Sequence, residues 1–287
     1  MSFQNKLHSA IRNSGSVLCT GLDPIPETMP PELRRQYDTD RELIHAWCRR
    51  VIEQTKTGTA AYKVNLAYFE AIGPEGLTLL DEVLDAIPSG KILIADAKRG
   101  DVPHSNERYK VAFFDRLGFD AITLSPFMGT ETLVPFLGDA SRAVYALTLT
   151  SNPGAAELMT RPFGKAPSLS AHLASLLRAC AAEHPGTLGM VIGATQSEVY
   201  GAVLKAYPEA PLLIPGVGAQ SGSIAELERH LAGHPGIPLI NVSRGLSAFN
   251  PESGENWDVQ IADNTARFKK AFQTISDRYL GDPDQPE

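Results

Sequence analysis

The sequence is poor in the features that mark secreted, metal-binding and membrane-spanning proteins. Among its 287 residues are three cysteines, Cys19, Cys48 and Cys180, which lie far apart and form no Cys-x-x-Cys motif. Cysteines spaced in this way are typical of free thiols in a reducing compartment and give no metal-binding knuckle. The start of the chain lacks the charged region and apolar run of a secretory signal, and no apolar stretch reaches the roughly 18 residues of a membrane span. We therefore expect a cytoplasmic protein that does not enter a membrane.

An excess of positive charge is also absent. The chain has 26 Lys and Arg residues against 33 Asp and Glu residues, which gives a net charge of −7, and it has no cluster of basic residues. This balance argues against binding to nucleic acid, so an anionic ligand must be held by local positive groups. The seven histidines show no metal-ligand spacing, and the motifs G-x-S-x-G and G-x-x-x-x-G-K-[ST] are missing. The sequence thus demands neither a metal nor an organic cofactor.

What the chain does contain is a regular alternation of short apolar segments with helical patterns. The segments expected to form strands are 16–24, 60–66, the run that begins at residue 92, 120–125, 143–151, 188–194, 211–215 and 237–243. The helices expected before, between and after them are 3–13, 40–57, 75–87, a segment that ends near 117, 130–138, 168–184, 196–206, 222–232 and 261–279.

This alternation indicates the fold class. Near-continuous apolar strands are typical of parallel strands that are buried on both faces. Eight of them, each followed by a helix, predict an α/β fold in which eight parallel strands form a (β/α)₈ or TIM barrel, with an open doubly wound sheet as the alternative. No break in composition divides the chain, so we expect a single catalytic domain over residues 1–280. Residues 281–287 are polar and rich in proline, which predicts a flexible tail.

The most informative stretch, residues 92–105, contains the end of the third expected strand. Asp96 and Lys98 are two residues apart, so on a strand their side chains share a face. Gly100 is expected to let the chain turn sharply as it leaves the strand. Two carboxylates, those of Asp96 and Asp101, flank the Lys98 ammonium, which should keep it protonated and able to donate a proton. A salt bridge that caps a buried strand is the alternative interpretation.

The other candidate residues also stand where expected strands end, and in a parallel barrel the active site is built at those carboxyl ends. The polar residues there are Asp23, Lys63, Asn65, Asp96, Lys98, Ser125, Ser151, Gln220, Ser243 and Arg244. A lysine among apolar neighbours requires a carboxylate partner, so Lys63 is expected to pair with Asp96 on the next strand. The result would be a row of alternating charges across the barrel mouth, from Lys63 to Asp101. Asp23, Ser125 and Ser151 stand beside turn-forming residues, so plain turns are their alternative.

A glycine-rich loop, residues 215–222, follows the seventh expected strand. Its spacing, G-x-G-x-x-x-G, misses the dinucleotide fingerprint G-x-G-x-x-G, so the loop gives little support to a Rossmann site. Glycines before a helix leave backbone N–H groups free to bind an anion, and barrels bind phosphate at the loops after strands seven and eight. Arg244, just past the eighth strand, can add a bidentate contact. Loop and arginine together predict a phosphate site, with turn chemistry alone as the alternative.

With these residues assembled, the chain resembles the orotidine 5′-phosphate decarboxylase family, most closely its bacterial second subfamily. The resemblance runs nearly end to end, from Leu22-Asp23-Pro24 to Ser243-Arg244-Gly245. Its most specific parts are the motifs ADAKRGD at 95–101, TSNPGA at 150–155 and IPGVGAQ at 214–220. The family converts orotidine 5′-phosphate to uridine 5′-phosphate and carbon dioxide in de novo pyrimidine biosynthesis, without a metal or an organic cofactor. The resemblance implies the same reaction here.

The resemblance also implies a role for each matching residue. Lys98 matches the lysine that protonates the ring carbon, Asp96 the acid that faces the substrate carboxylate, and Lys63 the lysine that links this row to the ribose. Asp101 matches an acid that reaches across a homodimer interface, and Ser105 is implied to contact the ribose there. The other substrate-binding positions are Asp23 for the ribose, Ser151 for the pyrimidine, and Pro215, Gln220, Ser243 and Arg244 for the ring and phosphate.

Two positions depart from the family pattern. Ser105 stands where the family usually has threonine, and Ser243 stands where many members have glycine. Ser105 keeps the hydroxyl, and neither change touches the acid and lysine row. Two rival functions share the expected fold. One is a magnesium-dependent phosphosugar decarboxylase or aldolase with the same Asp-x-Lys-x-x-Asp motif, and the other is a phosphate-binding barrel without catalytic activity.

Overall fold

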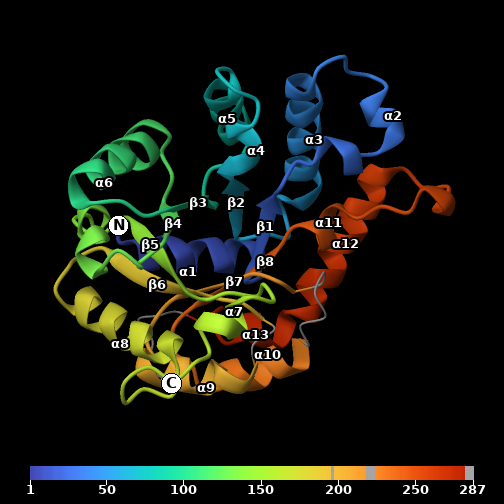
Figure 1. Ribbon diagram of the computed structural model, residues 1–287. Helices are drawn as coiled ribbons and strands as arrows, with labels where there is room; N and C mark the ends of the chain where they lie inside the picture. Colours follow the sequence, from blue (N-terminus) through green and yellow to red (C-terminus); the bar gives the residue numbers. More distant parts are fainter. Residues whose placement is uncertain (195–196, 218–223, 282–287) are drawn as a thin grey trace.

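Eight parallel strands close into a barrel in the computed structural model, which describes residues 1–194, 197–217 and 224–281 (Figure 1). The strands are β1 (Leu18–Leu22), β2 (Ala61–Asn65), β3 (Ile92–Arg99), β4 (Ala121–Leu124), β5 (Ala143–Leu149), β6 (Thr187–Ile192), β7 (Leu212–Ile214) and β8 (Pro238–Val242). Strands that are consecutive in sequence are neighbours in the barrel, and β1 pairs with β8 to close it. This confirms the predicted eight-stranded parallel barrel and excludes an open sheet.

Helices form a ring around the strands, as Figure 1 shows. The longer ones are α1 (Phe3–Ser14), α3 (Asp40–Thr55), α5 (Gly76–Asp85), α6 (Pro103–Lys110), α8 (Leu169–Ala182), α9 (Ser197–Ala206), α10 (Ile224–Leu231) and α12 (Trp257–Ala271). The short helices are α2 (Pro31–Arg34), α4 (Leu66–Glu70), α7 (Ala155–Leu158), α11 (Arg244–Ser247) and α13 (Gln273–Asp277). The described part of the chain also contains 3₁₀ turns, among them η1 (Pro26–Thr28) and η5 (Pro251–Ser253), and one π-helical segment. The sequence did not indicate α2, α4, α7 or α11.

Helix α1, which the sequence predicted at 3–13, packs across one end of the barrel. Its Phe3, Leu7 and Ile11 side chains are fully buried, and the Phe3 ring meets the Tyr145 ring of β5 edge to face, with centroids 6.3 Å apart. The Ser2 side chain caps the first turn by accepting the N–H of Asn5. With this end covered, the carboxyl ends of the strands form the open end.

Two expected helices differ from the structure. Residues 130–138 form two 3₁₀ turns, η3 (Thr130–Thr132) and η4 (Val134–Phe136), and no α-helix. Pro135 explains the difference, because proline has no N–H to donate within a continuous helix. The last expected helix begins earlier, at Trp257, where Asn256 caps it by accepting the N–H of Asp258, and it divides at Phe272 into α12 and α13. The helix after β3 continues beyond α6 as a π-helical segment, η2 (Val111–Arg116).

Short helices that directly follow a strand help to place polar groups at the open end. Asn65 ends β2 and caps α4, because its Oδ1 accepts the N–H of Ala67 at 3.2 Å. Arg244 is likewise the first residue of α11, with only Ser243 between it and β8. In both places a helix begins within one or two residues of the end of a strand, and a polar residue stands at the junction. This arrangement places the side chains of Asn65 and Arg244 at the rim of the barrel.

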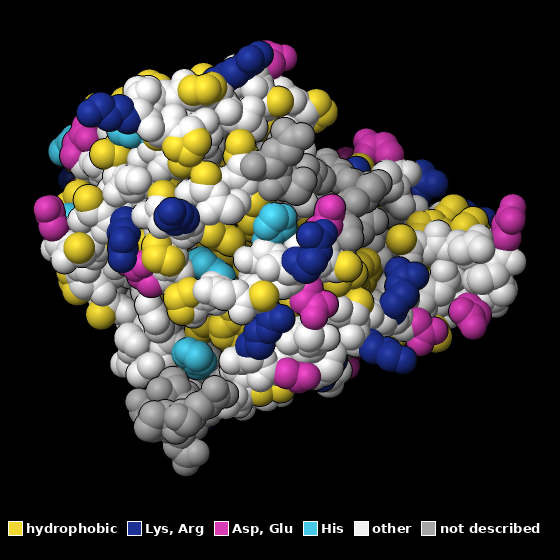
Figure 2. All heavy atoms as spheres, turned by 90° about the horizontal axis from the view of Figure 1, so that it is seen from below, with side chains coloured by type: hydrophobic (Ala, Val, Ile, Leu, Met, Phe, Trp, Pro, Cys, Tyr) yellow, Lys and Arg dark blue, Asp and Glu magenta, His cyan; other side chains and the backbone are white. Residues whose placement is uncertain are grey.

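The surface shows no large region of one charge on the face seen from below in Figure 2, where α9 and α10 lie. Basic and acidic side chains are interspersed there among uncharged and hydrophobic ones. In the described ranges, no helix is long and apolar enough to cross a membrane. The predicted tail falls almost wholly at 282–287, which lies outside the described residues.

Candidate active site

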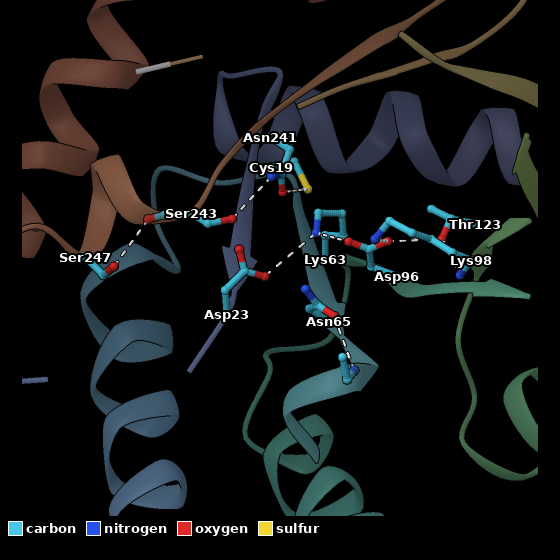
Figure 3. A network of polar contacts seen from close by, with 11 residues as sticks. Cys19, Asp23, Lys63, Asn65, Asp96, Lys98, Thr123, Asn241, Ser243 and Ser247 are labelled. Atoms are coloured by element: carbon cyan, nitrogen blue, oxygen red, sulfur yellow. Dashed lines mark hydrogen bonds and ion pairs between the residues drawn. The ribbon is translucent and has the colours of Figure 1, made fainter. Parts of the chain in front are cut away.

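Four charged side chains form a continuous row at the open end of the barrel (Figure 3). Asp23 follows β1, Lys63 is on β2, and Asp96 and Lys98 are on β3. The Lys63 Nζ atom is 4.0 Å from Oδ1 of Asp23 and also bonds to Oδ2 of Asp96. The Lys98 Nζ atom is 2.5 Å from the other oxygen of Asp96. The structure thus brings together the three residues that the sequence placed at neighbouring strand ends, with Asp23 added at one end.

The row ends at Lys98 within this chain. Asp101, expected to continue it, lies just beyond β3, where its Oδ1 accepts the N–H of Val102 at 2.7 Å. It forms no ion pair with any residue in the described ranges. Ser105 is half-buried in the first turn of α6, and its N–H bonds to the carbonyl of Val102. Among the described residues of one chain, no hydrogen bond or ion pair joins the side chain of Asp101 or Ser105 to the row.

Two members of the row, Asp96 and Lys63, have pKa values that are shifted by the charges around them. Burial works to raise the pKa of Asp96, but the ammonium groups of Lys63 and Lys98 outweigh it, and the pKa falls to about 2. Burial works to lower the pKa of Lys63, but the carboxylates of Asp96 and Asp23 outweigh it and raise the pKa above its ordinary value. Asp96 is therefore a carboxylate and Lys63 an ammonium throughout the neutral pH range, although both side chains are buried.

The backbone at Lys98 departs from regular strand geometry. Lys98 has a φ of 48°, the only positive φ at a non-glycine residue in the described part of the chain. The register between β3 and β4 also shifts, because Ala95 pairs with Ile122 whereas Arg99 pairs with Leu124. Strand β3 thus has two more residues than β4 over this interval, a bulge of the kind that redirects side chains beside active sites. The sequence predicted that Asp96 and Lys98 share a face because side chains alternate along a regular strand. The strand is not regular here, so their contact depends on the bulge as well.

The expectation that Gly100 makes the sharp turn is wrong. Gly100 is not among the glycines with positive φ, and the left-handed residue is Lys98, two positions earlier. A Cβ atom at Gly100 would lie 3.1 Å from both the Cβ and the carbonyl oxygen of Ser125, so Ser125 would have to shift slightly to accommodate a side chain there. The glycine lets the chain that leaves β3 pass close to the end of β4.

Two adjoining cavities open onto the row. One, of about 210 Å³, has mostly polar walls: Asp23, Lys63, Asn65, Asp96, Ser151, Pro215, Gly216, Val217, Asn241, Ser243, Arg244 and Gly245. The other, of about 410 Å³, has a more apolar wall: Lys63, Asp96, Lys98, Thr123, Leu147, Thr150, Ser151, Asn152, Val191, Leu213 and Pro215. Lys63, Asp96, Ser151 and Pro215 line both. A larger groove of about 520 Å³ along α3 contains none of the candidate residues, so size alone does not identify the site.

The described parts of the predicted phosphate-binding elements lie at the polar cavity, where Pro215, Gly216 and Val217 represent the loop, and loop residues 218–222 lie outside the described ranges. Arg244 lines it from the start of α11, is exposed, and forms no ion pair with an acid in the described ranges. Ser243 lies between Asn241, whose Nδ2 donates to its Oγ at 3.3 Å, and Gly21. A Cβ atom on Gly21 would lie 1.8 Å from the Ser243 Oγ, so the serine is accommodated by a glycine on the neighbouring strand. Gln220 lies outside the described residues.

Two polar residues of the site were missed by sequence reasoning. Thr123, in the middle of β4, bonds to both Asp96 and the backbone of Lys98. Asn241, in β8, accepts the Cys19 thiol at 3.6 Å as well as donating to Ser243. Both are single polar residues within otherwise apolar strands, and that interruption was the signal that could have identified them. Among the described residues, no group of three or more His, Cys, Asp or Glu side chains could hold a metal ion.

Comparison with known proteins assigns a family to this geometry. Residues 16–253 match the model of the family described as "Orotidine 5′-phosphate decarboxylase / HUMPS family". A curated relative from Roseiflexus castenholzii, named orotidine 5′-phosphate decarboxylase, is 38% identical over 277 residues, which are 96% of this chain and 95% of the relative. The solved structure of Leishmania donovani OMP decarboxylase is 32% identical, with a TM-score of 0.74, and the match covers 94% of this chain and 100% of that one.

A longer relative contains the same fold as part of its chain. The structure of Leishmania donovani UMP synthase is 32% identical, with a TM-score of 0.81, over 96% of this chain. The match spans only 57% of the UMP synthase chain. The curated Roseiflexus relative, in contrast, corresponds to this chain over nearly its whole length.

Proposed function

The chain belongs to the orotidine 5′-phosphate decarboxylase / HUMPS family, and on that premise we propose that it converts orotidine 5′-phosphate to uridine 5′-phosphate and carbon dioxide in pyrimidine biosynthesis. The observation that carries this proposal is the row of Lys63, Asp96 and Lys98 beside two cavities of different character. The names of the curated relatives favour this reaction over the phosphosugar rivals. We place the reaction in the cytoplasm, since all three cysteines are free thiols.

The two cavities match the two halves of the substrate. The ribose 5′-phosphate fits the polar cavity, where Arg244 can make charge-assisted hydrogen bonds to the phosphate. Asp23 has a buried Oδ1 with no hydrogen-bond partner, and a ribose hydroxyl can donate to it. The flat pyrimidine fits the other cavity, against the apolar side chains of Leu147, Val191 and Leu213. This placement brings the ring carboxylate toward Asp96 and Lys98.

The reaction breaks the bond between the ring carbon and its carboxylate. The electron pair of that bond stays on the ring carbon as carbon dioxide leaves, and Lys98 then donates a proton from Nζ to that carbon. The lysine regains a proton from solvent, so each turnover consumes one proton. An ammonium fixed beside the ring stabilises the developing negative charge more than it stabilises the ground state, which is the requirement for catalysis.

Asp96 serves this step in two ways. Its carboxylate holds Lys98 at 2.5 Å and so fixes the ammonium where the proton is needed. Its negative charge also faces the negative substrate carboxylate, and that repulsion is relieved when carbon dioxide departs. Lys63 keeps Asp96 ionised in both roles, because the low pKa of the buried acid depends on the ammonium groups beside it.

One ion pair cannot supply the whole acceleration. Enzymes lower reaction barriers by roughly 8–23 kcal/mol, more than a single charge contact contributes. We therefore assign part of the effect to the phosphate, which does not react. Its binding energy can hold the ring against the charged row and keep water away from the forming carbanion.

We further propose that two chains form a homodimer in which Asp101 and Ser105 complete the neighbouring site. Asp101 has no ionic partner among the described residues of its own chain. Exposed apolar side chains on the loops after β3 and β4 support an interface there, because Val102, Phe127 and Met128 are 48%, 52% and 51% exposed. A partner that covers these side chains would remove apolar surface from water.

The decisive experiment measures turnover with a chelator present. Purified protein in excess EDTA is expected to remove the ultraviolet absorbance of orotidine 5′-phosphate and to release uridine 5′-phosphate, identified by chromatography. No turnover of orotidine 5′-phosphate, together with turnover of a phosphosugar that disappears with EDTA and returns with Mg²⁺, would instead favour the phosphosugar class of enzyme. Binding of the nucleotide without any product would favour a phosphate-binding barrel without catalytic activity.

A further inference from the structure

Thr123 makes two hydrogen bonds that join the charged row to the backbone of Lys98. Its side chain is buried in the middle of β4 and is 1% exposed. The Oγ1 atom lies 3.1 Å from Oδ1 of Asp96 and 3.0 Å from the backbone nitrogen of Lys98 (Figure 3). The row of ion pairs and the bulged backbone thus meet at this one hydroxyl.

The chemistry of the partners fixes the direction of both bonds. A backbone N–H can only donate, so Oγ1 accepts a hydrogen bond from Lys98. An ionised carboxylate can only accept, so the same hydroxyl donates its one proton to Asp96. Each partner polarises the hydroxyl in the sense that strengthens the other bond. A side chain without a hydroxyl at this position could make neither bond.

The position of Thr123 in the sheet explains why this bridge is needed. It lies between Ile122 and Leu124, the two β4 residues that pair with β3 on either side of the bulge. Opposite it, β3 contains Lys98 with a φ of 48°, a conformation that is strained for any residue with a Cβ atom. The N–H of Lys98 donates to the Thr123 side chain, which holds the lysine in this conformation.

We propose that Thr123 is a positioning residue for proton donation by Lys98, because its hydroxyl fixes the Asp96 carboxylate and the Lys98 backbone relative to each other. The inference rests on the proposed decarboxylase function and adds a residue to its site. Without the hydroxyl, Asp96 would keep its ion pairs, but its carboxylate could rotate and Lys98 could leave the left-handed conformation. Nζ would then lie away from the ring carbon in part of the population.

The chain beyond Lys98 is held independently of Thr123. The Arg99 guanidinium pairs with Glu70 of α4 and lies over the rings of Tyr109 and Phe113, 5.5 and 5.9 Å from their centroids. The Arg99 carbonyl accepts the N–H of Ser125 at 2.7 Å. Loss of the Thr123 hydroxyl is therefore expected to affect the geometry at Lys98 while the fold is kept.

The test compares variants that differ in the hydroxyl. Thr123→Val keeps the shape and removes the hydroxyl, whereas Thr123→Ser keeps the hydroxyl and removes a methyl group. We expect Thr123→Val to lower kcat by on the order of 10–100-fold, the effect of a small misplacement of a reacting group. KM and the affinity for the product uridine 5′-phosphate should stay close to wild type. Thr123→Ser should restore most of kcat.

A matched control separates this role from the general effect of losing a buried hydroxyl. Thr265 of α12 is also buried, and its hydroxyl donates to the Ile261 carbonyl at 2.8 Å within the same helix, so Thr265→Val should retain wild-type kcat. Should Thr123→Val fail to fold, Thr123→Ala and Thr123→Ser form a second pair that differs only in the hydroxyl. Equal kcat in that pair, or wild-type kcat in Thr123→Val, would overturn the inference. An inactive wild-type protein would instead overturn the proposed function.

Discussion

The amino group of Lys98 lies 2.5 Å from the Asp96 carboxylate, although the Lys98 backbone has left the extended conformation. The pair is therefore set by two features together, a bulge in β3 that redirects Lys98 and a buried acid whose charge attracts it. A plain salt bridge at a strand end needs neither a bulge nor a left-handed residue. Strain of this kind persists where the surrounding structure imposes it, which is common at active sites.

Replacing Lys98 should stop the reaction while ligand binding is kept. Lys98→Ala is expected to lower kcat by on the order of 10³-fold or more, because it removes both the proton donor and the positive charge beside the carbanion. Binding of uridine 5′-phosphate, measured by calorimetry, should remain, since Arg244 and the apolar cavity are intact. Lys110→Ala, at the end of α6, where the lysine is half-buried and pairs with Glu107, is the control. Wild-type turnover in Lys98→Ala would remove the lysine from the mechanism.

Replacing Arg244 should act mainly on binding. Arg244→Ala is expected to raise KM roughly 10–100-fold, the loss of charge-assisted hydrogen bonds to a phosphate. Added salt should weaken substrate binding less in this variant than in the wild type, because part of the charge attraction is gone. Arg49→Ala, an exposed arginine on α3, is the matched control. A KM equal to that of the wild type would place the phosphate elsewhere.

The sequence predicted the barrel because its strands are continuous apolar runs, whose pattern is local. It also predicted the Lys63 and Asp96 pair, since adjacent parallel strands bring their carboxyl ends to the same rim. The bulge could not be predicted, because it depends on how β3 and β4 align and not on either strand alone. The sequence therefore placed the change in backbone conformation at Gly100, whereas the left-handed residue is Lys98. It also missed Thr123, which bonds to both Asp96 and Lys98. Asp101 has no ionic partner among the described residues, which agrees with a role that requires a second chain.

The low pKa of Asp96 predicts how stability depends on pH. The unfolded chain takes up this proton near the ordinary pKa of an aspartate, about 4, whereas the folded protein takes it up only near 2. The contribution to stability is therefore fully present above about pH 5 and is lost as the pH falls toward 2, by roughly 2 kcal/mol. Urea unfolding at several pH values measures this loss.

Asp96→Asn should change that profile in a specific way. The variant should be less stable at neutral pH, because the buried Lys63 keeps only Asp23 as an acidic partner, and its stability should fall less between pH 5 and 2. Asp263→Asn, an exposed position on α12, should leave the profile of the wild type. An identical loss of stability in Asp96→Asn and the wild type would mean that other acids cause it.

Mixing two inactive variants tests whether Asp101 serves the neighbouring chain. In a mixed dimer of Lys98→Ala with Asp101→Asn, one site would combine an intact Lys98 from the second variant with an intact Asp101 from the first. The other site would contain both substitutions. Random exchange makes half of the dimers mixed, and each has one intact site of two, so recovery of about a quarter of wild-type activity is expected for a two-fold symmetric dimer. If Asp101 instead acted within its own chain, every site would contain one substitution and no activity would return, even after subunit exchange is verified with differently tagged chains.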